Sequence, residues 1–232
     1  MRQLFIDSRD KVSGSSADFT VALPSTLNAS STQRMRIDSW RVPMTIPTVR
    51  PGVADQVVIT VGVGNYTLTL PGGQYDGATL AATLQSLLAN AAPGTWTVTY
   101  DASNVAMTIA NTNPFTFNGG SLGKLWLSYP YTTSADSKTW RFSYVSMLGV
   151  DVVYLACGQF ANLDCVGPKG VSDIVLAAPV TCGFGTVLEA SMPQDCWFDA
   201  PELSTNQLSF QVRDRDGRIL PLPNTSFTMT ID

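Results

Sequence analysis

Hydrophobic and polar residues alternate along much of this 232-residue chain. The alternation is clearest in residues 208–213 and 226–231, where every second side chain is apolar. A period of two is typical of a strand that buries one face. Between these segments, Asp216-Gly217 predicts a tight hairpin turn, because glycine adopts a positive φ at little cost. A strand at the end of the chain must then pair with strands from earlier segments.

Many other short segments are strand-like. They are residues 19–23, 35–40, 57–61, 65–70, 96–100, 105–109, 140–144, 150–155, 174–180 and 184–188. About ten strands separated by frequent turns are typical of a β-sandwich or a barrel. Strands from both ends of the chain must meet, as they do in a jelly roll. We therefore expect an all-β fold, a single jelly-roll β-sandwich with a small strand–helix–strand–strand insert.

One segment follows a helical period instead. Leu80, Leu84 and Leu88, together with Leu87, fall on one face of a helix. Asp76 precedes them and can accept hydrogen bonds from the free amides of a first helical turn. A Pro-Gly pair at 93–94 ends the pattern. The spacing predicts a helix near residues 77–91.

This helix belongs to a predicted α+β insert at residues 62–129. Residues 1–61 and 130–232 are expected to form the jelly-roll domain. Within it, residues 1–16 are polar and predict an extended arm that becomes ordered against a neighbour. We interpret the insert as a structural module that packs its helix on a small sheet, and a ligand-binding platform is the alternative.

The chain carries little charge. Only 14% of its residues are charged and its net charge is −4, against about 25% charged residues in typical globular chains. This favours either a surface covered by partners or a β protein with loops rich in Ser, Thr and Asn. Arg34, Arg36, Arg41 and Arg50 form the one local basic cluster, which we interpret as a solvated strand face or a salt-bridged edge. We expect no direct sequence-specific binding of nucleic acid.

No secretion signal and no run of about twenty apolar residues is visible in the sequence. We expect a protein made in the cytoplasm, without a membrane span. Cys157, Cys165, Cys182 and Cys196 form no CxxC pair. Free thiols are therefore expected, and a single disulfide remains an alternative.

The sequence argues against an enzyme, since histidine, the commonest general base and metal ligand, is absent. We predict no catalytic, cofactor-binding or metal-binding residues and no cofactor. Asp195 and Asp199 flank an aromatic pair, but two rim carboxylates are a commoner explanation than a glycosidase pair. Residues 214–217 resemble the start of a calcium loop, yet the acidic residue that closes such a loop is missing.

Seven stretches in three regions of the chain carry a family resemblance. They are IDSRDKVSGSSADFTVALP with VPMTIPTV near the start, GGQYDGATLAATLQSLLAN with TWTVTYDASNVAMTIAN in the insert, and VSDIVLAAPVTCGFGTV, LSFQVRDRDGRILPL and SFTMTID at the end. Together they resemble the single jelly-roll penton or minor capsid proteins of double-jelly-roll dsDNA viruses, which include polinton-like viruses and virophages. The resemblance covers nearly the whole chain and rests on strand and turn patterns.

The resemblance implies a structural virion protein. It would be a penton-like vertex protein that closes the fivefold positions of an icosahedral capsid as a homopentamer, beside a major capsid protein of the double jelly-roll type. Head-to-tail contacts close a ring only when their rotation fits the symmetry. Another minor position in the shell is left open.

A capsid-associated spike, fibre or cement protein is the alternative function. Trp126, Tyr129 and Tyr131 lie in an aromatic, nearly uncharged stretch, and such rings could stack on a host-surface glycan or contact a receptor. A carbohydrate-active enzyme would depend on Asp195 or Asp199. The sequence does not decide the outward face, the role of the insert or the oligomeric state.

Overall fold

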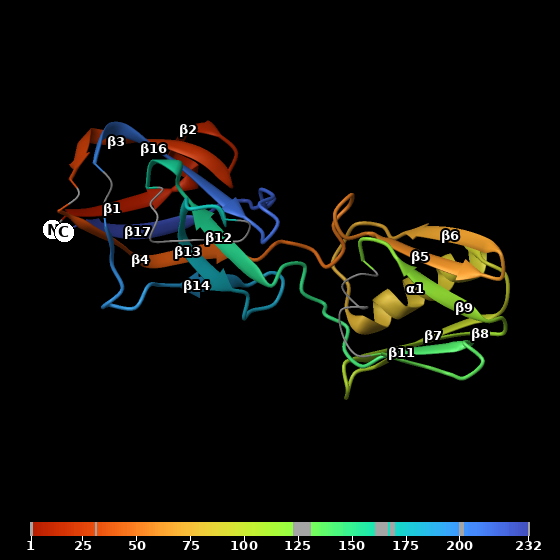
Figure 1. Ribbon diagram of the computed structural model, residues 1–232. Helices are drawn as coiled ribbons and strands as arrows, with labels where there is room; N and C mark the ends of the chain where they lie inside the picture. Colours follow the sequence, from red (N-terminus) through yellow and green to blue (C-terminus); the bar gives the residue numbers. More distant parts are fainter. Residues whose placement is uncertain are drawn as a thin grey trace. The chain divides into compact units, whose positions relative to one another are not determined.

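The computed structural model describes residues 2–30, 32–122, 131–160, 167, 170–199 and 202–231. The chain folds into two compact units (Figure 1). We call Met1–Ile46 with Val150–Asp232 the terminal unit, and Pro47–Gly149 the inserted unit. Each has a hydrophobic core of its own.

Two sheets form the terminal unit. One has the strand order β1-β17-β4-β14, with β15 also paired to β4, and the other has the order β13-β12-β16-β3-β2. The strands of the first sheet are β1 (Arg2–Asp7), β17 (Ser226–Ile231), β4 (Arg34–Pro43), β14 (Val187–Ala190) and β15 (Phe198–Asp199). Those of the second are β13 (Ile174–Pro179), β12 (Val152–Ala156), β16 (Leu203–Arg213), β3 (Asp18–Ala29) and β2 (Lys11–Gly14).

The pairing is that of a jelly roll. β1 pairs with β17, β3 with β16, β4 with β14, and β12 with β13, all antiparallel. Strands near the two ends of the chain thus pair with each other, and strands closer to its middle pair among themselves. This order of pairing distributes two Greek keys over the two sheets. The predicted all-β single jelly-roll β-sandwich is confirmed.

Aromatic side chains hold the two sheets together. Phe210 of β16 meets Phe227 of β17 edge-on, with ring centroids 4.7 Å apart, and Phe19 of β3 lies 5.8 Å from Phe210. Phe210 is fully buried. Trp40 of β4 is also buried, and its indole nitrogen donates to Thr225 Oγ1 at 2.9 Å. The core thus joins strands from both ends of the chain.

The N-terminal segment is not an extended arm. β1 pairs along its whole length with β17, from Arg2 opposite Ile231 to Asp7 opposite Ser226, and β2 pairs with β3. A short 3₁₀ turn, η1 (Ser8–Asp10), joins the two strands. The prediction of an extended arm was therefore wrong. Only Leu4 and Ile6 of this mostly polar segment reach the core of the terminal unit, so its hydrophobic pattern is too short to indicate a strand.

The turn at 214–217 was predicted at the right place, but it does not join two paired strands. Asp214 N donates to Arg218 O, and Gly217, at φ +81°, donates to Asp214 O. The returning chain makes a single bridge, from Arg213 to Ile219. β16 then lies in one sheet and β17 in the other, so the turn starts a crossover between sheets.

In the inserted unit two sheets enclose one helix. The sheet orders are β6-β5-β9 and β10-β11-β8-β7, and α1 lies between them in Figure 1. The elements are β5 (Gln56–Val61), β6 (Gly64–Thr69), α1 (Gly77–Ala91), β7 (Trp96–Asp101), β8 (Ala106–Asn111), β9 (Phe115–Gly119), β10 (Tyr131–Thr133) and β11 (Thr139–Phe142).

Residues 47–149, rather than the expected 62–129, form this unit. Strand pairing gives the reason, since β5 pairs with β6 and β9, while β11 pairs with β8. Phe117 of β9 also meets Trp140 and Phe142 of β11 at ring distances of 5.4 and 5.2 Å. β11 therefore belongs to the inserted unit, although the sequence analysis had assigned it to the jelly-roll domain.

α1 occupies the range expected from the leucine spacing. Leu80, Leu84 and Leu88 are buried in the inserted unit's core. Asp76 caps the helix, because its side chain accepts a hydrogen bond from Thr79 N at 2.7 Å. In return, the Asp76 backbone nitrogen donates to Thr79 Oγ1 at 3.0 Å. These local contacts fix where the helix begins.

Candidate functional surface

Three arginines of the basic cluster lie on a salt-bridged face of the first sheet, whereas the fourth, Arg50, lies in the inserted unit. Arg36 pairs with Asp38 at 2.7 Å and Arg41 with Glu189 at 2.5 Å. Arg34 lies 3.8 Å from Asp199. Each of these three guanidinium groups is offset by a carboxylate, so the strand does not present the uncompensated positive charge that phosphate binding requires.

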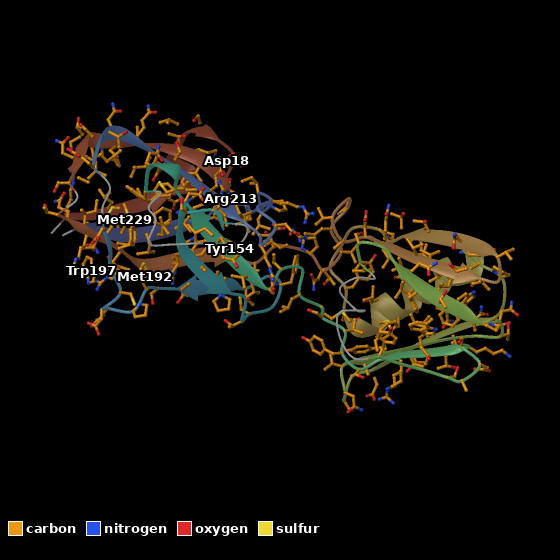
Figure 2. All side chains as sticks on the ribbon, in the orientation of Figure 1. Asp18, Tyr154, Met192, Trp197, Arg213 and Met229 are labelled. Atoms are coloured by element: carbon orange, nitrogen blue, oxygen red, sulfur yellow. The ribbon has the colours of Figure 1, made fainter. Side chains whose placement is uncertain are left out.

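Both carboxylates of the candidate pair lie at the surface. Asp199 lies in β15 beside Arg34, and its side chain is largely exposed. Asp195 is also exposed. Trp197, which lies between them in sequence, stacks under the guanidinium of Arg36, 4.7 Å from the ring centroid. Figure 2 shows Trp197 close to Met192 on this face.

Two of the three aromatic candidates, Trp126 and Tyr129, lie outside the described residues. Tyr131 is described and its side chain is 45% exposed. Its ring stacks on Trp140 at 5.1 Å. One face of Tyr131 is therefore engaged by the inserted unit, which leaves the remainder of the ring available to a ligand.

Exposed apolar side chains lie at both margins of the terminal unit. Phe5 of β1 is 77% exposed and Val12 of β2 is 57% exposed. β1 and β2 are edge strands of their sheets, and in Figure 1 they lie along the same margin. Phe184 and Val187 are about half exposed, and Val187 begins β14, the edge strand of the opposite margin.

Open strand edges and exposed apolar side chains together are features of a surface that another chain covers. An unpaired edge is a template for association. Sequence reasoning did not identify Phe5. A signal was present, because Leu4-Phe5-Ile6 puts an apolar side chain on both faces of one strand.

Described cysteines are free thiols of differing exposure. Cys157 is buried, Cys182 is partly buried and Cys196 is exposed. Burial raises the pKa of the Cys157 thiol to about 12, which keeps it protonated and unreactive. Cys165 lies outside the described residues.

Among the described residues, no group of three or more His, Cys, Asp or Glu side chains gathers to ligate a metal. The turn at 214–217 is held by its own hydrogen bonds, with Asp214 Oδ1 accepting from Asp216 N and Arg218 N at 2.9 Å. Within the same described ranges, no helix has the length and apolar character needed to cross a membrane.

Comparison with known proteins places the fold. Neither protein families nor curated protein sequences show a match to the chain. Among solved structures, the chain is similar to the mavirus penton protein, with a TM-score of 0.55 and 10% sequence identity. The alignment covers 100% of this chain and 99% of that protein. What the two chains share is their fold.

Proposed function

We propose that this chain is a structural virion protein, a penton-like vertex capsid protein that closes the fivefold positions of an icosahedral shell. The observation that carries the proposal is the alignment with the mavirus penton protein, which spans both chains almost completely. It takes in the jelly roll and the inserted unit together, so the whole architecture is shared.

The surface of the terminal unit supports the proposal. Its two margins are different surfaces, one carrying Phe5 and Val12 and the other Phe184 and Val187. A contact between unlike margins is heterologous, and a heterologous contact closes into a ring when the rotation between copies fits the symmetry. The low charge of the chain suits burial of much of its surface against neighbours.

The proposed partners are further copies of this chain and a major capsid protein of the double jelly-roll type. The protein would be made in the host cytoplasm and end in the capsid. No catalytic role is part of the proposal, since Asp199 is paired with Arg34 and Trp197 with Arg36.

Native mass spectrometry of the purified full-length chain tests the oligomeric state. We expect a homopentamer. Co-expression with the major capsid protein, followed by sedimentation of assembled particles, tests the location, and we expect the chain to sediment with particles at vertex stoichiometry. A chain that is monomeric alone and absent from particles contradicts the proposal.

A second candidate function, a spike, fibre or cement protein that binds a host glycan, is favoured by one observation, the partly exposed Tyr131 ring stacked on Trp140. Aromatic faces of this kind support sugar rings. A trimer in the mass spectrum and binding to a glycan array that is lost on Tyr131→Ala would favour this candidate over the vertex protein.

A further inference from the structure

A crevice on the outer face of the second sheet has an apolar floor and a charged rim. Its volume is about 230 Å³, and its apolar lining comes from Tyr154, Val171 and Ile174. Tyr154 and Arg213 are directly opposed on β12 and β16, and Figure 2 shows their side chains close together. Residues 213–217, four of which are charged, form the rest of its lining.

These lining residues face away from the jelly-roll core. Leu155 and Val212, the sequence neighbours of Tyr154 and Arg213, are fully buried in that core, and strand neighbours point to opposite faces. Ile174 is only 8% exposed although it is outside the core cluster. Gly167 covers it closely, since a Cβ added at Gly167 would lie 2.0 Å from Ile174 Cδ1.

An ion pair fixes the rim. Arg213 Nη1 lies 2.9 Å from Asp173 Oδ2, and both side chains are mostly buried. Arg213 Nε also donates to Gln211 Oε1 at 2.7 Å. The guanidinium is thus held at the mouth of the crevice, where an aromatic ring could pack against it.

Phe5 has the size and position to fill this crevice in another copy. It is 77% exposed, and a dry apolar cavity of about 150 Å³ already accommodates benzene. Phe5 lies on the edge strand β1, whereas the crevice lies over β12 and β13 at the opposite margin. Phe5 and the crevice thus lie on different sheets, each at or near an edge of its sheet.

We propose that Phe5 of one copy inserts into the crevice formed by Tyr154, Val171 and Ile174 of the next copy. Because the knob and the crevice lie on opposite margins, each copy offers both halves of the contact, and repetition of the contact makes a head-to-tail ring. The inference rests on the proposed vertex function, for which it supplies the contact between neighbours.

Substitution of each half separately tests the contact. Phe5→Ala empties the crevice and Val171→Arg fills it, and each is expected to weaken the oligomer by roughly tenfold to a hundredfold in dissociation constant. Both side chains are exposed, so the folded subunit should be retained, which circular dichroism checks. Val63→Ala is the matched control, because Val63 is fully exposed in the inserted unit.

Disulfide trapping then reports which surfaces touch. In a background with Cys165, Cys182 and Cys196 replaced by Ser, Phe5→Cys combined with Val171→Cys should give a ladder of cross-linked species up to the closed ring on a non-reducing gel. Either cysteine alone should give monomers. Dimers from Phe5→Cys alone would show a two-fold contact and overturn the proposal.

The outcomes separate this contact from the proposed function. Pentamers that are indifferent to Phe5→Ala and Val171→Arg, and that do not cross-link, would overturn the contact and leave the vertex function standing. Open chains whose formation depends on both Phe5 and Val171 would support the contact and contradict the pentameric vertex. A wild-type chain that stays monomeric, together with a double-cysteine variant that forms no cross-links, would overturn the contact.

Discussion

At the residue scale, phenylalanine has two opposite roles in the terminal unit. Phe210 is fully buried and packs between rings from both sheets, so truncation there would leave a cavity. Phe5, at the surface, is 77% exposed and contributes little to the stability of the isolated subunit.

Asp76 links residue chemistry to pH dependence. Hydrogen bonds from Thr79, first from its backbone nitrogen and then from its hydroxyl, hold the pKa of the Asp76 carboxyl below its usual value of 3.8. A lowered folded-state pKa means that the ionised carboxylate stabilises the fold above pH 3.8. This contribution is lost as the pH falls from 3.8 through the folded-state pKa.

We therefore expect the free energy of unfolding to fall with acidification below pH 3.8 partly through Asp76. Asp76→Asn keeps an oxygen that can accept at the cap and removes the titrating group, so it should flatten this part of the profile. Denaturant unfolding at a series of pH values measures the effect, and an NMR titration of the Asp76 carboxyl gives its pKa directly. Identical pH profiles for the two proteins would contradict the prediction.

At the element scale, the connection between α1 and β7 depends on one glycine. Gly94 has φ +107°, and a Cβ there would lie 2.0 Å from Asn111 Oδ1. Asn111 is buried and its side-chain amide donates to Pro93 O at 3.2 Å. The backbone of the connection and the side chain that holds it therefore occupy the space that any larger residue would need.

Gly94→Ala should destabilise the protein by roughly 1–3 kcal/mol, because alanine is strained at this φ and displaces Asn111. The midpoint of chemical denaturation at constant slope measures the loss. Gly73→Ala is the control, since the nearest atom to an added Cβ is a Tyr75 ring carbon at 3.7 Å, an ordinary contact. Equal midpoints for the two variants would contradict the argument.

Elements fixed by local contacts were the ones that sequence could predict. The helix depends on leucine spacing and an Asp76–Thr79 cap within one segment, and it lies where expected. The turn at 214–217 was also located correctly, but its chemistry does not determine which sheet receives the returning chain. β1 was missed for the same reason, because its partner is β17, at the other end of the sequence.

The candidate surface was less predictable than the fold. Alternation indicates that a strand has one buried face, but it does not tell which strand lies at an edge of the sheet. Phe5 becomes significant only when the strand order places β1 at a margin. The crevice likewise depends on Gly167 and Val171 coming back over β13, a long-range arrangement that has no short sequence pattern.

At the scale of the whole molecule, the chain enters the inserted unit near residue 47 and leaves it near residue 149, and these two ends lie close together. Thr48 Oγ1, near the start of the unit, donates to Met147 O, near its end, at 2.9 Å. The unit has its own core, formed by α1 and both of its sheets. Adjacent ends and an independent core are the properties that let a domain be inserted into another without disturbing it.

Two reciprocal deletions test this independence. Residues 47–149 produced alone should unfold in a single cooperative transition, because the core of the inserted unit lies wholly within them. The chain with residues 47–149 replaced by a short Gly-Ser linker should keep the jelly roll, and should still form the oligomer, since Phe5 and the crevice both lie in the terminal unit. Circular dichroism and native mass spectrometry measure the two outcomes. A folded but monomeric jelly roll, made from a chain that is pentameric when intact, would show that the inserted unit supplies the contacts that close the ring.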